Sequence, residues 1–212
     1  MNKTNKTQVR TGMVGLLSVR GITAIAMLSA ISILLMLFDI PLWFAPSFYK
    51  IDLSEVPVLI GAFALGPVAG IVIEFVKILL NLMINGTATA FVGEFANFLI
   101  GCSLVVPAAI IYHQWKSKNA ALTGLIIGTV SMVAVGSLLN AFLLLPVYSK
   151  AFNMPMEALI GMGAAVNPSI NSLSTFVLFA VVPFNLLKGV IVSVITMLLY
   201  KRVSSVIKGF HN

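Results

Sequence analysis

Charge is scarce in this sequence. Only 9% of its 212 residues are charged, whereas 59% are hydrophobic, and the mean hydropathy is +1.07. A soluble domain carries about 25% charged and about 45–50% apolar residues. A soluble fold of this length has too little interior to hide so much apolar surface. The composition therefore predicts an integral membrane protein.

Cysteine and histidine are scarce too. The chain has one cysteine, Cys102, and two histidines, which excludes a disulfide-stapled secreted domain and a zinc module. The sequence has no Ser-His-Asp set, no P-loop and no dinucleotide-binding glycine pattern. We therefore expect no enzyme, no cofactor and no metal site. Energy for any active transport must come from another chain or an ion gradient.

Long runs without charge predict the helices, because a helix needs about 20 apolar residues to cross a bilayer. The runs cover residues 21–38, 56–73, 78–93, 95–112, 119–149 and 158–200, the last interrupted by Lys188. A single helix over 56–84 would be about 43 Å long, too long for a bilayer unless steeply tilted. Gly66-Pro67 offers a turn there. Six helices follow if it is a turn, and five if it is only a kink.

The positions of the basic residues favour six helices over five. The net charge of +7 can indicate nucleic-acid binding, but here the basic residues stand at the ends of the apolar runs. With six helices, the basic clusters before the first helix, between the fourth and fifth, and after the last share one side. The positive-inside rule makes that side the cytoplasm. The other side keeps only Lys50 and Lys150.

The fold class predicted is thus an all-α integral membrane protein, a six-transmembrane-helix bundle with both termini cytoplasmic and an outward-facing ligand cavity. One membrane domain spans residues 1–212. It has a basic N-terminus over 1–19, the bundle over 20–205 and a tail over 206–212. Two long outer loops, 39–55 and roughly 149–175, carry aromatics and prolines. Such loops are often lids or binding segments, so a ligand is expected from outside.

Ionisable groups at membrane depth are expensive and suggest function. Glu74 and Lys77 are three residues apart on one predicted helix and are expected to neutralise each other. Glu94 with Asn97, and Asn185 with Lys188, repeat that spacing. Lys188 has no acidic residue nearby in sequence, so it needs a partner, a ligand or water. Extension of its ammonium group to the outer interface is the alternative.

Asn140 lies inside the 119–149 run. Its amide offers donors and an acceptor that suit the imide-like edge of a heterocycle, although an interhelical hydrogen bond is the alternative. In the predicted topology Asn140, Asn185 and Lys188 share the outer half of the bundle. A few polar groups in an apolar, aromatic-lipped cavity are typical of a small-molecule site.

Several motifs resemble one family. Residues 48–57 (FYKIDLSEVP), 66–70 (GPVAG, followed by Glu74 and Lys77) and 92–98 (VGEFANF) look like the signature of the substrate-binding (S) components of energy-coupling factor (ECF) vitamin transporters. Residues 137–148 (SLLNAFLLLPVY) and 183–189 (PFNLLKG) are similar to its riboflavin-specific branch. The resemblance covers roughly residues 20–205.

This resemblance implies a division of labour in a bacterial plasma membrane. An S component captures its vitamin, here riboflavin or the larger FMN or FAD, from outside. A membrane scaffold, the T component, and two ATPases supply the energy, and the S component is thought to topple in the bilayer to release its cargo. Nucleic acid is not among the implied partners.

The resemblance also assigns roles to residues. The flavin would accept or donate hydrogen bonds at Asn140, Asn185 and Lys188. The other implied contacts are a gate at Phe48 and Tyr49 and a polar wall at Asn97 and Glu94. The small residues Ala26 and Ala30 on the first helix match the family's docking surface for the scaffold, since small residues let helices approach closely in lipid.

Three alternatives remain from the sequence. One is an S component for another vitamin. The second is a stand-alone ion-coupled transporter, which predicts inverted repeats and paired broken helices, whereas the break at Gly66-Pro67 has no partner in the second half. The third is a structural membrane subunit in which the polar cluster only joins helices.

Overall fold

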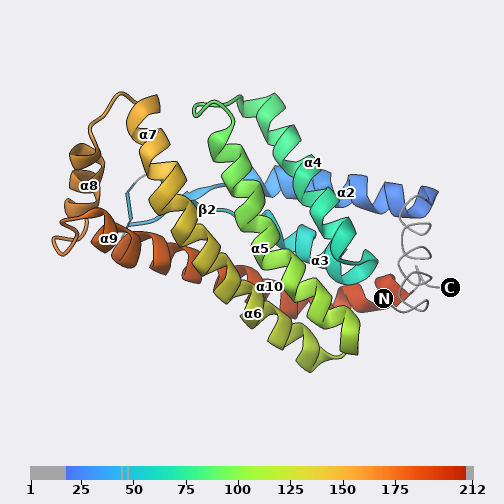
Figure 1. The fold of residues 1–212 in the computed structure, drawn as a ribbon. Helices are drawn as coiled ribbons and strands as arrows, with labels where there is room; N and C mark the ends of the chain where they lie inside the picture. Colours follow the sequence, from blue (N-terminus) through green and yellow to red (C-terminus); the bar gives the residue numbers. More distant parts are fainter. Residues whose placement is uncertain (1–17, 44, 47, 209–212) are drawn as a thin grey trace, which may run out of the picture.

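Helices make up nearly all regular structure in the computed structural model, which describes residues 18–43, 45–46 and 48–208, with side chains up to residue 199 (Figure 1). The helices are α2 (Val19–Met36), α3 (Glu55–Leu65), α4 (Pro67–Asn85), α5 (Val92–Trp115), α6 (Lys118–Leu139), α7 (Leu145–Ala151), α8 (Met156–Ala164), α9 (Leu173–Phe176) and α10 (Val182–Lys208). Two π-helical turns, η1 (Asn140–Leu144) and η2 (Val177–Val181), join α6 to α7 and α9 to α10. Strands β1 (Ile40–Pro41) and β2 (Lys50–Ile51) pair antiparallel, with Ile40 opposite Ile51. The predicted basic segment 1–19 and tail 206–212 fall largely outside the described residues.

Five helices of the described chain are long and apolar enough to cross a membrane. They are α2, α4, α5, the continuous helix Lys118–Ala151 and the helix from Leu173 to Leu199. The all-α prediction is confirmed, but six spans are not. The remaining segment, α3, has 11 residues. At 1.5 Å per residue it covers about 16 Å, roughly half of the hydrocarbon core.

The turn predicted at Gly66-Pro67 is present and separates α3 from α4. Gly66 has φ 106° and ψ 167°, a conformation that side chains with a Cβ rarely adopt. Pro67 is the first residue of α4, where its missing N–H removes no helical hydrogen bond. The two helices are therefore distinct, as the sequence indicated.

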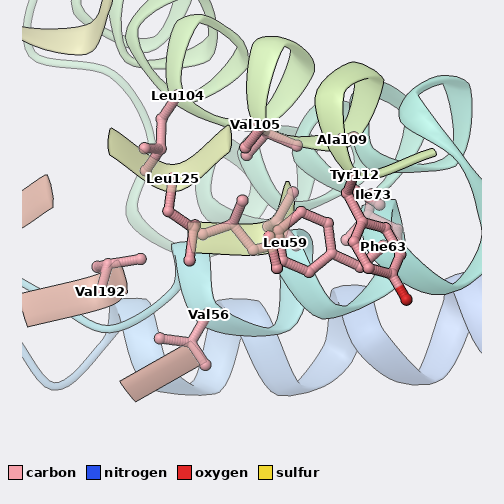
Figure 2. Packing of buried hydrophobic residues seen from close by; sticks show 14 of the residues in the cluster. Val56, Leu59, Phe63, Ile73, Leu104, Val105, Ala109, Tyr112, Leu125 and Val192 are labelled. Carbon is pink, nitrogen blue, oxygen red and sulfur yellow. The ribbon is translucent and has the colours of Figure 1, made fainter. Parts of the chain in front are cut away.

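Helix α3 is short because it is a core helix. Its side chains pack on every side: Val58, Leu59 and Ala62 have no exposed surface. Figure 2 shows Leu59 and Phe63 of this helix surrounded by side chains of α4, α5, α6 and α10. A helix that is apolar all round is typically buried in this way. Helix α3 therefore lies at the centre of the bundle, where it contacts other helices instead of lipid.

The apolar run over 158–200 does not form one helix, and its first part overlaps the predicted outer loop of roughly 149–175. Helix α8 ends at Ala164, and helical structure resumes only at Leu173. Pro168 stands in the intervening segment, and Ser172 caps the new helix through a reciprocal capping box with Thr175. This part of the chain belongs to the second long loop instead.

Three basic residues, Arg20, Lys116 and Lys118, lie at one end of the bundle. In Figure 1, α2 begins, α3 turns into α4, α5 turns into α6, and α10 ends at that same end. Arg20, Lys116 and Lys118 belong to these segments. The opposite end carries the α4–α5 loop, the two strands and α8. The charge pattern read from the sequence thus corresponds to a real asymmetry of the fold.

Helices α5 and α6 approach each other closely along two glycines. A Cβ at Gly124 would lie 2.6 Å from the carbonyl oxygen of Ala108, and a Cβ at Gly128 would overlap the carbonyl oxygen of Leu104. Backbone atoms cannot move aside as a flexible side chain does. Close backbone approach through small residues is a common way to join helices in lipid.

We expect Gly128→Ala to lower the free energy of unfolding by about 1–3 kcal/mol, because the added methyl group overpacks the α5–α6 contact. Thermal unfolding in detergent measures it. The matched control is Gly161→Ala in α8, where a Cβ would meet no atom within 4 Å. Equal effects of the two substitutions would contradict this account of the contact.

Candidate functional site

A cavity of about 450 Å³ lies at the end of the bundle that carries the α4–α5 loop and the two strands, opposite Arg20, Lys116 and Lys118. Helices α4, α5 and α10, the helix through η1 and the loop after α2 all contribute to its wall. Ligand cavities usually measure about 300–1,000 Å³. Every predicted binding residue lines this one cavity: Asn140, Asn185, Lys188, Phe48, Tyr49, Asn97 and Glu94. Their contact with a ligand stays a prediction.

The two asparagines are held by their own helices. Asn140 is the first residue of η1 and donates from Nδ2 to the Gly136 carbonyl at 2.8 Å. Asn185 follows η2 by four residues and donates from Nδ2 to the Val181 carbonyl at 2.9 Å. π turns occur often at functional sites. Here the two π turns lie beside buried amides whose orientation is fixed before any ligand arrives.

Gly136 makes room for Asn185. A Cβ at position 136 would lie 2.9 Å from both polar atoms of the Asn185 amide. Any larger residue at position 136 would therefore displace the Asn185 amide. Sequence reasoning missed Gly136, because a glycine within an apolar helix has no distinct signal until its neighbour is known.

Tyr49 connects the loop after α2 to the cavity. Its hydroxyl donates to Oδ1 of Asn140 at 2.7 Å, and its side chain is buried. Burial, and secondarily the nearby Tyr148, raises the pKa of the Tyr49 phenol above its usual range. The phenol therefore stays protonated and remains a donor. This hydrogen bond fixes the first long loop over the Asn140 amide.

An aromatic wall surrounds that hydrogen bond. The Tyr49 ring centroid lies 4.8 Å from that of Phe48 and 4.9 Å from that of Phe184. Tyr148 meets the Phe48 ring edge-on at 5.8 Å. These distances are those of favourable aromatic pairs. The cavity thus combines flat aromatic surfaces with polar and charged side chains.

Lys188 has an acidic partner that the sequence did not indicate. Its ammonium nitrogen lies 3.0 Å from Asp52 Oδ2 and 4.0 Å from Glu55 Oε1. Lys188 is only 6% exposed, so its side chain is enclosed by protein instead of extending to the surface. Asp52 lies 136 residues away in the chain, directly after β2. Only its place in the 48–57 motif marked it out.

Asp52 is charged despite its burial. Burial works to raise the pKa of its carboxyl, but the Lys188 ammonium, then Lys77 and the hydrogen bond from Ser54, outweigh it and hold that pKa well below its usual range. A carboxyl whose pKa is lowered by folding stabilises the folded state at pH values above its pKa in the unfolded chain. This stabilisation is lost as the pH falls through the pKa of the folded state. The ion pair therefore persists at neutral pH.

A second buried ion pair adjoins the first. Lys77 lies 2.7 Å from Glu74, the predicted partner, and that prediction is confirmed. It also lies 2.9 Å from Glu55 at the start of α3, which sequence reasoning missed. All three side chains are at most 1% exposed. The cluster joins α3, α4 and α10 behind the cavity.

Glu94 and Asn97 line the cavity from the first turns of α5. Both are half-buried. Glu94 accepts hydrogen bonds from the hydroxyls of Thr87 at 3.0 Å and Thr89 at 3.5 Å, both in the α4–α5 loop. Among the described residues, no ion pair neutralises Glu94, so this part of the cavity is acidic.

Ala26 and Ala30 lie outside the cavity. Both are exposed on α2, together with the large apolar side chains of Ile22 and Met27. This face is separate from the ligand cavity and available for contact with lipid or another membrane protein. Within the part of the chain that is described, no group of three or more His, Cys, Asp or Glu side chains is arranged to hold a metal ion.

We predict that Asp52→Asn lowers the free energy of unfolding by about 3 kcal/mol or more at neutral pH, because it leaves the Lys188 ammonium buried without its closest partner. Chemical or thermal unfolding in detergent measures this loss. In acid, where native Asp52 becomes protonated, the difference between the two proteins should shrink.

Asp39→Asn is the control. Asp39 forms an ion pair with Lys50 at 2.9 Å, but both side chains are more than 40% exposed. Exposed pairs contribute at most about 1 kcal/mol. A similar loss of unfolding free energy in both variants would mean that the buried ion pair contributes no more than the exposed one.

Comparison with known proteins identifies relatives. The family model described as "ECF transporter, substrate-specific component" matches residues 20–200. The chain is 39% identical over 184 residues to "Riboflavin transporter RibU" of Staphylococcus aureus (strain TCH60), covering 87% of this chain and 90% of that protein. It is 32% identical over 185 residues to "Riboflavin transporter FmnP" of Bacillus subtilis (strain 168), covering 87% and 92%.

A solved structure has the same fold. It is described as "Structure and mechanism of the S component of a bacterial ECF transporter", and it matches with a TM-score of 0.68 at 37% sequence identity. The match covers 88% of this chain and 96% of the solved one. The family resemblance read from the motifs is thereby confirmed over nearly the whole chain.

Proposed function

The chain belongs to the substrate-specific components of ECF transporters, and from this premise we propose that it captures riboflavin on the outer face of a bacterial plasma membrane. Its relatives are named as transporters, and the chain is a transporter component rather than an enzyme. Membership in this family argues against a stand-alone ion-coupled transporter.

The observation that carries the proposal is the composition of the cavity wall. Its apolar surface includes the aromatic rings of Phe48, Tyr49 and Phe184, and its polar groups include the fixed amides of Asn140 and Asn185 and the ammonium of Lys188. An isoalloxazine ring has two flat apolar faces and one edge of alternating carbonyl and N–H groups. Amides offer both donors and acceptors to such an edge, and an ammonium donates to a carbonyl. Phe48 and Tyr49 would cover the ring as a gate.

The orientation of the cavity supports uptake from outside. The positive-inside rule assigns the end that carries Arg20, Lys116 and Lys118 to the cytoplasm. The cavity lies at the other end and would open outward. In this topology both termini are cytoplasmic, and α3 completes a six-segment path together with the five spans. The whole chain would act as one membrane domain.

Release needs partners, because the sequence contains no P-loop. We assign the energy supply to a T component and two ATPases, as the family implies. The exposed pair Ala26 and Ala30 on α2 would be the docking surface for the T component, since their small side chains allow close helix contact.

Titration of the purified protein with riboflavin, followed by quenching of flavin fluorescence, tests the function. We expect Asn185→Ala to weaken binding about 10-fold to 100-fold, as loss of hydrogen bonds worth about 1–3 kcal/mol implies. The control is Asn119→Ala, an exposed asparagine in the first turn of α6 outside the cavity.

The outcome separates the alternatives. Normal riboflavin binding by Asn185→Ala would contradict the assigned site. No riboflavin binding by the native protein, with another vitamin bound instead, would favour an S component of different specificity. No binding of any vitamin would favour a structural subunit.

The charges of the cavity favour a neutral flavin over FMN or FAD. Both lysines in its wall are paired, Lys50 with Asp39 and Lys188 with Asp52. Glu94 adds an uncompensated negative charge among the described lining residues. A phosphate group would find no free ammonium there and would be repelled by this carboxylate.

We therefore predict that Glu94→Gln raises the affinity for FMN relative to riboflavin about threefold to tenfold, which corresponds to roughly 1 kcal/mol of removed repulsion. Competition between the two flavins in the titration measures this ratio. Glu157→Gln in α8, an exposed carboxylate outside the cavity, should leave the ratio unchanged. An unchanged ratio in Glu94→Gln would show that Glu94 does not discriminate between riboflavin and FMN.

A further inference from the structure

The charges buried behind the cavity do not balance. Five charged side chains form one cluster: Asp52 before α3, Glu55 in α3, Glu74 and Lys77 in α4, and Lys188 in α10. Asp52 and Lys188 line the cavity, and the other three lie behind it. Asp52 and Lys188 form one balanced pair at 3.0 Å. Lys77, however, faces two carboxylates, Glu55 at 2.9 Å and Glu74 at 2.7 Å. Three carboxyl groups thus share two ammonium groups.

The excess charge falls on Glu55 and Glu74. Both carboxyl groups lie over the same spot on α5: a Cβ at Gly101 would lie 2.7 Å from Glu74 Cδ and 3.2 Å from Glu55 Oε2. Glu55 Oε2 and both carboxylate oxygens of Glu74 are buried, and of these three only Glu74 Oε1 has a donor beside it, the Lys77 ammonium at 2.7 Å. Glu55 Oε2 and Glu74 Oε2 therefore lack the donors that a buried carboxylate needs.

No other described group near them supplies the missing charge. Cys102 on α5 is uncharged as a thiol and lies close enough to interact electrostatically with both glutamates. Lys188 approaches Glu55 only to 4.0 Å and belongs to Asp52. A metal ion lacks the necessary ligands, since no group of three or more His, Cys, Asp or Glu side chains in the described chain suits one.

We propose that Glu55 and Glu74 bind one proton between them in the folded protein at neutral pH. The hydroxyl of one carboxylic acid would donate to the carboxylate oxygen of the other, and Lys77 would neutralise the remaining negative charge. Two carboxyl groups that share one site cannot both ionise without strong repulsion, so a single shared proton is the usual solution.

This proton gives the cluster zero net charge. Three carboxyl groups with one proton carry two negative charges, which equal the two ammonium groups. A net charge in a low-dielectric interior costs several kcal/mol, whereas a neutral cluster avoids that cost. The site is distinct from the ligand cavity, because Glu55, Glu74 and Lys77 do not line the cavity.

The sign of the pH dependence follows from proton counting. In the unfolded chain both glutamates are ionised at neutral pH. The folded protein then binds one proton more than the unfolded protein, so its stability falls as the pH rises. Glutamine in place of Glu74 mimics the protonated carboxyl and removes this dependence.

Infrared spectroscopy of the full chain in detergent at neutral pH tests the proposal. A protonated carboxylic acid has a C=O stretching band that is well resolved from the bands of carboxylates. We expect this band in the native protein and its loss in Glu74→Gln, since Glu55 alone then pairs with Lys77 as a carboxylate. Glu55→Gln should remove the band as well. The control Glu157→Gln should keep it.

Thermal unfolding as a function of pH provides the second measurement. Native protein and Glu157→Gln should lose stability as the pH is raised above neutral. Glu74→Gln should be at least as stable as the native protein at pH 7, because its folded state needs no extra proton, and should lose less stability above that pH. A native protein without the protonated-carboxyl band would overturn the proposal. So would a band that persists in both Glu74→Gln and Glu55→Gln, or stability that depends on sodium ions instead of pH.

Discussion

The buried contact between Asp52 and Lys188 is the interaction on which the rest of the structure depends. An ammonium group in an apolar bundle needs a partner, and here the partner comes from the loop after β2 rather than from a helix. The pair fixes that loop against α10. The adjoining Lys77 contacts fix the start of α3 to α4. One connected set of charges thus sets the depth of α3 and the inner wall of the cavity.

The polar groups proposed to select the ligand are held in place by the protein itself. Asn140 and Asn185 each donate one amide hydrogen to a carbonyl of their own helix. Gly136 leaves the space that the Asn185 amide occupies. Little conformational entropy is then lost on binding, which favours high affinity. Aromatic rings from the first loop and from α10 complete a slot suited to a flat heterocycle.

Patterns that are local in sequence were predictable. Apolar runs located the spanning helices, apart from the first part of the last run, and Gly66-Pro67 located the turn. The seven residues predicted to bind the ligand all line one cavity, and their contact with the ligand stays a prediction. Properties that depend on distant contacts were not. Nothing near Lys188 in the chain indicates that Asp52 is its ion-pair partner. The apolar composition of α3 does not distinguish a helix buried in the protein from one that faces lipid. The π turns beside the two asparagines likewise arise from packing between helices, which one sequence does not reveal.

The central claim is that this cavity holds a flavin, and the most direct measurement is the visible absorption spectrum of the protein purified in mild detergent without added ligand. The account predicts a yellow preparation with the absorption bands of oxidised flavin at close to one equivalent per chain, and mass spectrometry of the released compound should identify riboflavin. A colourless preparation that also fails to take up added riboflavin would contradict it.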